Sequence, residues 1–248
     1  MKIKLKSGLL FIEKIGFVPT FLYFIQRIIL RKDSLIKMRI PSVKNTIYLR
    51  NKSYDTHIFN QIFIKEEMVF IKLKNHCINT IIDAGANIGL FTIYIKNKFP
   101  DSSILSIEPS IKNFEILKKN IEGYENISII HGALMGTDKM VSISNPLENY
   151  ASFQVAENFN SNCINAYSLL YFLQLPGFEK IDLVKMDIEG SERDVFDHIE
   201  EEVLNKISAL AIEIHEHLNP GTYTLILNKL KEFNHHDALG EYNFFTKL

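Results

Sequence analysis

The sequence of 248 residues predicts an α/β protein with a mostly parallel, doubly wound sheet, preceded by a helical N-terminal extension. From about residue 78 onward, short apolar and β-branched runs alternate with stretches of helical spacing, which is typical of βαβ units. The runs are almost wholly apolar, as expected of central strands that are covered on both faces. Polar motifs follow the ends of these runs, where parallel sheets bind their ligands.

Each element is assigned from its own pattern. We expect strands at residues 78–83, 103–108, 127–131, 138–144, 181–186 and 209–214, and a closing strand or hairpin at about 237–247. Helices are expected at residues 90–98, 111–122, 167–175, 191–199 and 222–233. Ser110 can cap the helix that follows it, and Pro176 with Gly177 ends the helix before them. Residues 145–162 are rich in Asn and Ser and are expected to form a long loop.

The N-terminal part differs from the rest in charge. Residues 1–45 are expected to form a basic, apolar and mainly helical extension, and residues 46–248 to form the main domain. A strand is expected at residues 43–50, across this boundary, and a helix at residues 55–73. Residues 1–32 hold seven Lys or Arg and a single Glu, although the whole chain has a net charge of −1. This balance gives no case for nucleic acid binding, but the basic N-terminus is suited to an anionic surface.

The apolar stretch from Phe17 to Leu30 is 14 residues long, which is too short to span a bilayer. Two alternatives stay open for it: a helix that docks on the core, or one that lies in a membrane interface with Arg27, Arg31 and Lys32 at its end. Residues 1–32 are therefore a candidate for peripheral membrane contact. No cleavable signal sequence is evident, and the two cysteines share no CxxC spacing. We expect reduced thiols and a cytoplasmic location, with membrane association left open.

The first polar motif, from Asp83 to Gly89, follows the first strand of the regular alternation and reads DAGANIG. Its glycines permit a tight turn and a close approach of the backbone to a ligand, which helix N-terminal amides then face. Glu108 ends the next strand, where a carboxylate can accept two hydrogen bonds from a ribose diol. The two motifs together predict a ligand that contains a ribose.

Three interpretations of this site compete. A dinucleotide site prefers GxGxxG, but Asn87 and Leu90 stand where its second and third glycines would be. A methyltransferase uses the same geometry with an acidic residue before the first glycine. Asp83 can then accept hydrogen bonds, directly or through water, from the cationic amino end of S-adenosylmethionine. In the third interpretation the glycines serve packing alone. The combination of DxGxNxG with Glu108 favours the methyltransferase.

Four motifs resemble those of FkbM-type methyltransferases. They are Asp83 to Gly89, Ile107-Glu108-Pro109, Lys185 to Gly190 (KMDIEG) with Glu192, and Glu213-Ile-His215. The upstream residues Tyr48-Leu-Arg50, Asp55, Phe59 and Phe63 are also similar to that family, and the resemblance runs from about residue 46 to 235. The chain departs where the family often has a Leu-Asp pair, because Leu169 is followed here by Leu170.

The resemblance implies a Rossmann-like methyltransferase fold with S-adenosylmethionine as its cofactor. Asp83, Gly85 and Asn87 would lie near the methionine part, and Glu108 would hold the ribose. Residues 131–134 would lie near the adenine, where Ala133 and Leu134 either line the base or belong to the core. The predicted cofactor-binding residues are Asp83, Gly85, Asn87, Gly89, Glu108, Ala133 and Asp187.

The catalytic candidates are Asp187, Glu189 and His215. Alternation would point Lys185, Asp187 and Glu189 the same way, where they could share a proton, bind a divalent cation or orient sugar hydroxyls. The alternative is a structural ion cluster that caps the next helix. His215 is the best base at neutral pH by residue type, although a histidine at a strand end is often structural. No metal-binding spacing such as HExxH occurs, and no metal is predicted.

Methyl transfer from a sulfonium is an in-line displacement, so the protein mainly aligns the reacting atoms and helps to deprotonate an alcohol acceptor. We expect O-methylation of a small-molecule or glycan acceptor. The resemblance implies a sugar hydroxyl of a surface glycan or glycolipid, or a hydroxyl of a secondary metabolite. Arg50 and Asp55 either contact the acceptor or form a surface ion pair. The alternatives are a non-catalytic module for an adenosyl ligand or a protein partner, and an NAD-dependent dehydrogenase. The oligomeric state has no signal in the sequence.

Overall fold

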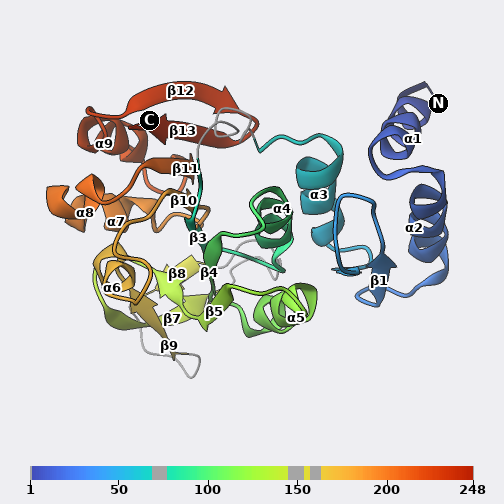
Figure 1. Ribbon diagram of the computed structural model, residues 1–248, viewed down its shortest axis with the longest axis horizontal. Coiled ribbons are helices and arrows are strands. Elements are labelled where there is room, and N and C mark those ends of the chain that lie inside the picture. Colours follow the sequence, from blue (N-terminus) through green and yellow to red (C-terminus); the bar gives the residue numbers. More distant parts are fainter. Residues whose placement is uncertain (1, 69–76, 145–153, 157–162, 248) are drawn as a thin grey trace.

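The computed structural model describes residues 2–68, 77–144, 154–156 and 163–247. The strand order of its central sheet is β12 (Asn234–Leu239), β13 (Tyr242–Thr246), β11 (Ala209–Glu213), β10 (Leu183–Met186), β3 (Thr80–Ala84), β4 (Ser103–Glu108) and β5 (Ile127–His131). The strands from β11 to β5 in this order are parallel, and β13 is antiparallel to β11 and β12 (Figure 1). The predicted fold class, an α/β protein with a mostly parallel sheet, is confirmed.

Helices cover both faces of the sheet, as a doubly wound fold requires. They are α4 (Leu90–Lys98), α5 (Ile111–Ile121), α6 (Leu169–Leu173), α7 (Glu192–His198), α8 (Glu201–Asn205) and α9 (Thr222–Lys229). In Figure 1, α4 and α5 lie on one side of the sheet and α6 to α9 on the other. Successive strand residues alternate between the two layers: Ile81 shares a core with Leu90 of α4, whereas Ile82 shares one with Phe196 of α7.

The chain winds in two directions from β3. The strands β4 and β5 follow on one side of β3, whereas β10 and β11 lie on its other side. Strand order therefore reverses between β3 and β10, and ligands of such sheets bind outside the carboxyl ends of that pair. The register pairs Ala84 at the end of β3 with Met186 at the end of β10. The turn motifs that follow these two strands consequently meet at the edge of the sheet.

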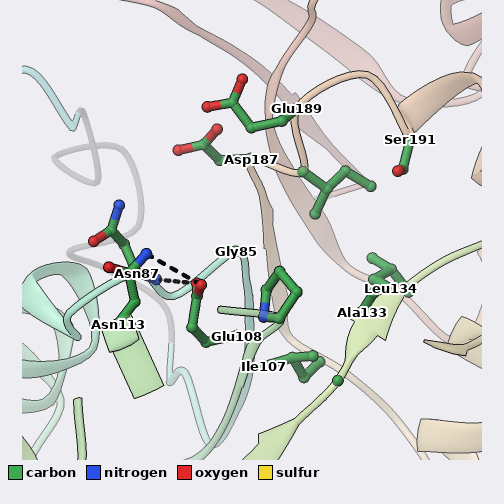
Figure 2. A pocket seen from close by; sticks show the side chains of 13 residues that line it. Gly85, Asn87, Ile107, Glu108, Asn113, Ala133, Leu134, Asp187, Glu189 and Ser191 are labelled. Carbon is green, nitrogen blue, oxygen red and sulfur yellow. Dashed lines mark hydrogen bonds between the residues drawn. The ribbon is translucent and has the colours of Figure 1, made fainter. Parts of the chain in front are cut away.

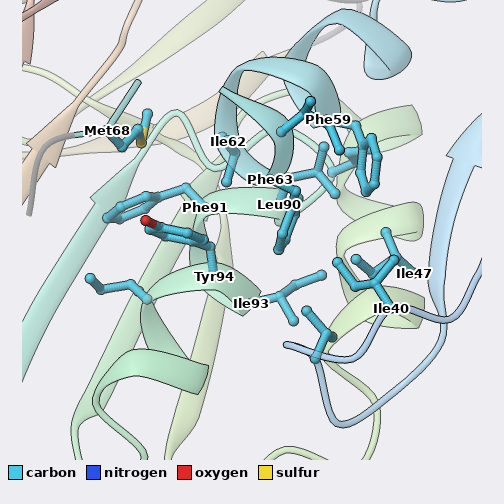
Figure 3. Close-up of a cluster of buried hydrophobic side chains, with 14 of the residues drawn as sticks. Ile40, Ile47, Phe59, Ile62, Phe63, Met68, Leu90, Phe91, Ile93 and Tyr94 are labelled. Atoms are coloured by element: carbon cyan, nitrogen blue, oxygen red, sulfur yellow. The ribbon is translucent and has the colours of Figure 1, made fainter. Parts of the chain in front are cut away.

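The N-terminal segment packs against α4. It consists of α1 (Lys2–Ile15), α2 (Phe17–Ile29), β1 (Leu35–Met38), β2 (Ile47–Arg50), α3 (Asp55–Phe59) and the π-helical turn η1 (Asn60–Ile64). Figure 3 shows Phe59, Ile62 and Phe63 of this segment beside Leu90 and Tyr94 of α4. One apolar core thus joins the N-terminal segment to the sheet domain.

The structure differs from the expectations where strands are short. β1 lies in a stretch that was expected to be helical, and it pairs with β2, so the predicted boundary between residues 45 and 46 falls within a β-hairpin. Ile36 and Met38 are buried and Lys37 is exposed, but a period of two over four residues does not stand out in the sequence. The helix expected over 55–73 ends at Ile64, and residues 69–73 lie outside the described part.

A second, smaller sheet continues from the end of β5. Its strand order is β6 (Ala133–Leu134), β9 (Cys163–Tyr167), β7 (Lys139–Ser144) and β8 (Gln154–Ala156). The strand expected at 138–144 is thus present. β8 lies within the expected loop at 145–162, of which residues 145–153 and 157–162 are outside the described part. The helix α6 begins later than expected because Ser168 caps it, accepting a hydrogen bond from the N–H of Tyr171.

Candidate active site

The turn after β3 packs directly on the turn after β10. Gly85, Asn87 and Gly89 have positive φ angles of 74°, 52° and 82°. A side chain on Gly85 would place its Cβ 1.7 Å from the carbonyl oxygen of Asp187. Gly85 is therefore required both for the backbone conformation and for the contact between the two motifs.

We expect Gly85→Ala to weaken the binding of S-adenosylmethionine at least about tenfold, because the new Cβ must push the two turns apart. Gly177→Ala is the matched control, since Gly177 has a φ of 85° but nothing within 4 Å of the added Cβ. The control introduces the same backbone strain without the clash. A calorimetric titration of both folded variants provides the measurement, and equal affinities in the two would contradict this reading of the turn.

Glu108, at the end of β4, is buried and held by three donors. The N–H of Asn87 donates to Oε2 at 2.7 Å, and the amide of Asn113 donates to Oε1 at 3.2 Å (Figure 2). The N–H of Ser110 also donates to Oε1, at 2.9 Å. Burial raises the pKa of Glu108 to about 7, against the effect of these hydrogen bonds. A carboxylate offers about four acceptor positions, so one remains on Oε2 for a ligand hydroxyl. The sequence had predicted two hydrogen bonds to a ribose diol.

A buried ion pair links Glu108 to the N-terminal segment. Arg50, the last residue of β2, donates to both carboxylate oxygens of Asp55, from Nε at 2.9 Å and from Nη2 at 2.7 Å. Nη2 also donates to Oδ1 of Asn113 at 2.7 Å, and Asn113 donates in turn to Glu108. Arg50 and Asp55 are 5% and 1% exposed, so they form no surface pair. They brace Asn113, and through it the carboxylate of Glu108.

Asp55→Ala is expected to lower the free energy of unfolding by about 3–5 kcal/mol, because it leaves the Arg50 guanidinium buried without its counter-charge. Glu115→Ala is the control: it removes an exposed pair with Lys118, at 2.9 Å, and should change stability by less than about 1 kcal/mol. Urea denaturation measures both. A loss below about 1 kcal/mol for Asp55→Ala would show that the Arg50 site does not depend on this carboxylate.

A pocket with about 490 Å³ of empty space lies beside Glu108 at the point where strand order reverses. Its lining consists of Gly85, Asn87, Ile107, Glu108, Pro109, Asn113, Gly132, Ala133, Leu134, Asp187, Ile188, Glu189 and Ser191. Figure 2 shows Asp187 and Glu189 on a different side of the pocket from Ala133 and Leu134. The lining fits S-adenosylmethionine, with an apolar wall for the base, Glu108 for the ribose and carboxylates toward the cationic end.

A second pocket, with about 720 Å³ of empty space, adjoins the first. It is lined by Tyr54, Ile58, Gln61, Ile62, Glu67, Met68, Gly85, Ala86, Asn87, Ile88, Leu90, Phe91, Lys185, Asp187, Glu189, Glu213, Glu241 and Tyr242. The residues common to both pockets are Gly85, Asn87, Asp187 and Glu189. The two pockets therefore meet at the two motif turns, where a donor in the first can face an acceptor in the second.

Asp83 lies behind the pocket wall and lines neither pocket. Its Oδ2 accepts a hydrogen bond of 2.6 Å from the hydroxyl of Thr92, and its Oδ1 lies 3.4 Å from Nζ of Lys185. Lys185 also lies 3.6 Å from Asp187 and donates to the carbonyl of Gly85 at 2.8 Å. Burial disfavours the ammonium of Lys185, but the charges of Asp83 and Asp187 outweigh it and raise its pKa. In this arrangement Asp83 fixes Lys185 and, through it, the turn.

Glu189 stands at the junction of the pockets, with a φ of 52°. Its Oε2 lies 3.4 Å from Nε2 of His215, and Nδ1 of that ring lies 2.9 Å from Oε1 of Glu192. Burial and the charge of Asp187 raise the pKa of Glu189 to about 7. Burial by itself would lower the pKa of His215, but Glu192, Asp187 and Glu189 raise it to about 9. At neutral pH His215 is therefore a cation held among carboxylates, and it lines neither of the two pockets.

Among the described residues, Asp187, Glu213 and His215 form a group that could hold a metal ion, since their ligand atoms lie within 4.8 Å of one another. Nε2 of His215 lies 3.6 Å from Oε1 of Glu213, and Nζ of Lys185 lies 3.6 Å from Asp187. A metal would have to displace the proton that the raised pKa keeps on His215. The cationic side chains of His215 and Lys185 lie beside the carboxyl groups of Asp187 and Glu213, where they supply the positive charge that a metal ion would bring.

The sequence analysis missed the residues that distant segments contribute to the second pocket. Tyr54 precedes α3, and Tyr242 belongs to β13, where its hydroxyl donates to Oδ2 of Asp187 at 3.1 Å. Glu241 accepts a hydrogen bond of 2.9 Å from the amide of Gln61. The N-terminal and C-terminal segments thus meet at this pocket. Contacts across such sequence distances leave no local pattern from which they could be predicted.

The fold and the site together define a class of protein. A sheet with this strand order, a glycine-rich turn after its first parallel strand, an acidic residue after the second and two adjoining pockets are the arrangement of S-adenosylmethionine-dependent methyltransferases. A family model described as the methyltransferase FkbM domain matches residues 83–243. The chain therefore belongs to the FkbM methyltransferase family. The predicted resemblance to this family is confirmed.

The curated proteins that are similar to this chain include two methyltransferases. Methyltransferase 1 of Beauveria bassiana (strain ARSEF 2860) is 27% identical over 158 residues, which cover 54% of this chain and 64% of that protein. Methyltransferase sdnD of Sordaria araneosa is 28% identical over 174 residues, covering 55% and 66%. The match thus spans just under two thirds of each relative. A crystal structure of methyltransferase FkbM from Methylobacillus flagellatus KT is 16% identical, with a TM-score of 0.44, over 67% of this chain and 43% of that one.

Proposed function

We propose that the protein transfers the methyl group of S-adenosylmethionine to a hydroxyl of an uncharged, hydroxyl-rich acceptor. The acceptor classes are a sugar of a surface glycan or glycolipid, or a secondary metabolite. The observation that carries the proposal is the position of Glu189, a carboxylate with a pKa raised to about 7 at the junction of the two pockets. A general base is most effective when its pKa lies near the operating pH.

The lining of the second pocket supports a neutral polyol as acceptor. It includes the carboxyl side chains of Glu67, Asp187, Glu189, Glu213 and Glu241. Carboxyl groups form hydrogen bonds with hydroxyl groups, and the charge of those that are ionised opposes the entry of phosphate or carboxylate groups. Met68, Phe91 and the two tyrosines of the same lining offer apolar surface for the less polar faces of a ring. An acceptor of this chemistry presents the hydroxyl that a carboxylate base can deprotonate.

The side chains divide the work as follows. Bound S-adenosylmethionine supplies an electrophilic methyl group on its sulfonium, and Glu108 holds one ribose hydroxyl. Glu189 takes the proton from the acceptor hydroxyl as the methyl group is transferred. His215, fixed by Glu192, orients Glu189, and its charge lowers the pKa of Glu189 against the effect of burial. Asp187, held by Tyr242, accepts a hydrogen bond from a neighbouring acceptor hydroxyl.

This division moves the role of the base from His215 to Glu189. Residue type alone favoured His215, because an unperturbed imidazole titrates near neutral pH. Its contacts with Glu192, Glu189 and Glu213, however, leave it protonated and occupied at both ring nitrogens. It is therefore a positioning residue for Glu189 in the proposed reaction.

The experiment that tests the proposal measures S-adenosylhomocysteine formation with paired acceptors. Neutral glycosides are compared with the same glycosides carrying a uronate or a phosphate, and with an amino sugar. We expect turnover with a neutral acceptor and at least about tenfold lower kcat/KM for its anionic partner, since like charges in the pocket would meet. Methylation of the amino group in preference to any hydroxyl, or equal use of the anionic acceptors, would contradict the proposal.

The pH dependence follows from the same carboxylate. Only the ionised form of Glu189 can accept the proton, and its pKa is raised from its usual 4.5 to about 7. With S-adenosylmethionine saturating at every pH, we expect kcat/KM for the acceptor to rise about tenfold per pH unit below pH 7 and to level off above it. Under the same conditions, Glu189→Gln should remove this rise from the residual activity. A wild-type profile that is flat between pH 5.5 and 8 would exclude Glu189 as the base.

A further inference from the structure

The outer side of α2 is covered by large apolar side chains that face solvent. Those with exposures between 49% and 79% are Phe17, Val18, Phe21, Leu22, Ile28 and Ile29. At 100° per residue they fall on one continuous arc, made of the adjacent rows 17–21–28 and 18–22–29. The neighbouring α1 adds Leu9 and Ile12 to the exposed apolar surface. In an ordinary amphipathic helix the apolar arc faces the core, whereas in α2 it faces solvent.

The polar residues of α2 face the protein instead. Thr20 is buried and donates to the carbonyl of Gly16 at 2.7 Å. The amide of Gln26 exchanges hydrogen bonds with the backbone of Lys37 in β1, at 2.9 and 3.0 Å. Arg27 donates to the hydroxyl of the buried Tyr23 at 3.3 Å. The helix is thus anchored through its polar side and turns its apolar side outward.

The helix pair is fixed to the wall of the second pocket. The ring of Tyr23 lies 5.4 Å from that of Phe11 in α1 and 6.0 Å from that of Phe59 in α3, between ring centroids. Lys14 of α1 pairs with Glu66 at 3.0 Å. Figure 1 shows α1 and α2 at the far end of the molecule from α6 to α9, outside α3. The exposed arc is therefore held in a set direction relative to the pocket, which α3 and η1 help to line.

The residues around the arc carry a positive charge, which is suited to an anionic surface. Residues 1–32 hold seven basic residues and one acidic residue. Arg31 and Lys32 are exposed directly after α2, and Lys37 and Arg39 are exposed at the adjacent strand. None of the described helices is long and apolar enough to cross a bilayer. A short helix with an apolar face rich in Phe, Leu and Ile and flanked by cations has the chemistry of an interfacial helix on anionic lipid.

We propose that α2 lies in the surface of an anionic phospholipid bilayer, with its apolar arc in the acyl boundary and the basic residues at its end against the headgroups. The second pocket is thereby held close to the membrane surface. The proposal does not depend on the reaction or on the identity of the acceptor.

Vesicle flotation tests this directly. The full-length protein is mixed with phosphatidylcholine vesicles or with vesicles that hold about 30% phosphatidylglycerol. The phosphatidylglycerol gives the second kind of vesicle a negative surface potential. We expect at least about tenfold stronger binding to the anionic vesicles, falling with added salt. Phe21→Glu/Ile28→Glu should abolish binding. Ile111→Glu, at a 52% exposed apolar position on α5, is the control and should bind as the wild type does.

Arg31→Glu/Lys32→Glu should remove the preference for anionic lipid. Circular dichroism confirms the fold of each variant, and light scattering gives the oligomeric state. Folded, monomeric wild type that fails to float would overturn the proposal, as would binding that Phe21→Glu/Ile28→Glu leaves intact. A dimer that this variant dissociates would also overturn it, because a second copy would then cover the arc.

Discussion

Glu189→Gln is expected to lower kcat by about 10² to 10⁴, the range that a positioned general base contributes. The amide keeps the size of the side chain and its place at the junction of the two pockets, but it cannot accept the acceptor's proton. The affinity for S-adenosylmethionine should change little, because Glu108 and the pocket walls remain. Steady-state kinetics with a saturating methyl donor measure the effect.

Glu213→Gln is the matched control for that variant. Glu213 is also a carboxyl group beside His215, and burial raises its pKa to about 8, but it lines the second pocket only. We expect it to change KM for the acceptor more than kcat. A loss of kcat in Glu213→Gln that equals the loss in Glu189→Gln would mean that the cluster acts as a unit and that Glu189 is not the base. Unchanged kcat in Glu189→Gln would also mean that Glu189 is not the base.

The second large effect is expected for Glu108→Ala. A hydrogen bond to a charged group contributes about 1.5–3 kcal/mol, so loss of the ribose contact should raise the Kd for S-adenosylmethionine roughly 10- to 100-fold. The affinity of the wild type should also fall below pH 7. The reason is that a ligand hydroxyl donates to the ionised carboxylate, whose pKa is about 7. Titration calorimetry at pH 6 and pH 8 measures both effects.

Glu115→Ala controls for the loss of a carboxylate near the same helix, since Glu115 is exposed and pairs only with Lys118 among the ion pairs described for it. Its Kd should match that of the wild type at both pH values. Glu108→Ala also leaves the N–H groups of Asn87 and Ser110 without their acceptor, so its fold must be checked by thermal unfolding. A folded Glu108→Ala protein with wild-type affinity would remove Glu108 from the cofactor site.

The fold was predictable where elements are long or bounded by strong signals. The apolar runs that form β3, β4 and β5 stand between clear turns, and α4 begins directly after Gly89. The structure has β4, α4 and β5 at the expected residues. β1, β6 and β9 were not predicted. They are two to five residues long, and their stability comes from partners that lie elsewhere in the chain.

The candidate site was predictable in position but less so in roles. Strand ends at a reversal of strand order gather the polar motifs, and this needs only the βαβ pattern. The role of Asp83 depends on the register between β3 and β10, which places it opposite Lys185. The charge of His215 depends on its contact with Glu192. The sequence shows Glu192 as part of a motif but does not show that it contacts His215. Asp55, Arg50 and Asn113 form a chain of hydrogen bonds. Arg50 and Asn113 are 63 residues apart in the sequence, so this chain has no local signature.

The N-terminal segment contributes residues to both sides of the candidate site. Its Arg50 and Asp55 brace Glu108 through Asn113, and Tyr54, Ile58 and Ile62 line the second pocket. The same segment carries the outward-facing α2. One apolar core joins this segment to the sheet domain, so the proposed sites for cofactor, acceptor and lipid are held in fixed positions relative to one another.

The central claim is that the pocket beside Glu108 binds S-adenosylmethionine. Calorimetric titration of the purified wild-type protein with S-adenosylmethionine and, separately, with NAD tests it most directly. We expect S-adenosylmethionine to bind with a Kd in the micromolar range, a binding free energy of about −8 kcal/mol, and NAD to show no measurable binding. Folded protein that binds NAD instead, or that binds neither ligand with or without a glycoside present, would contradict it.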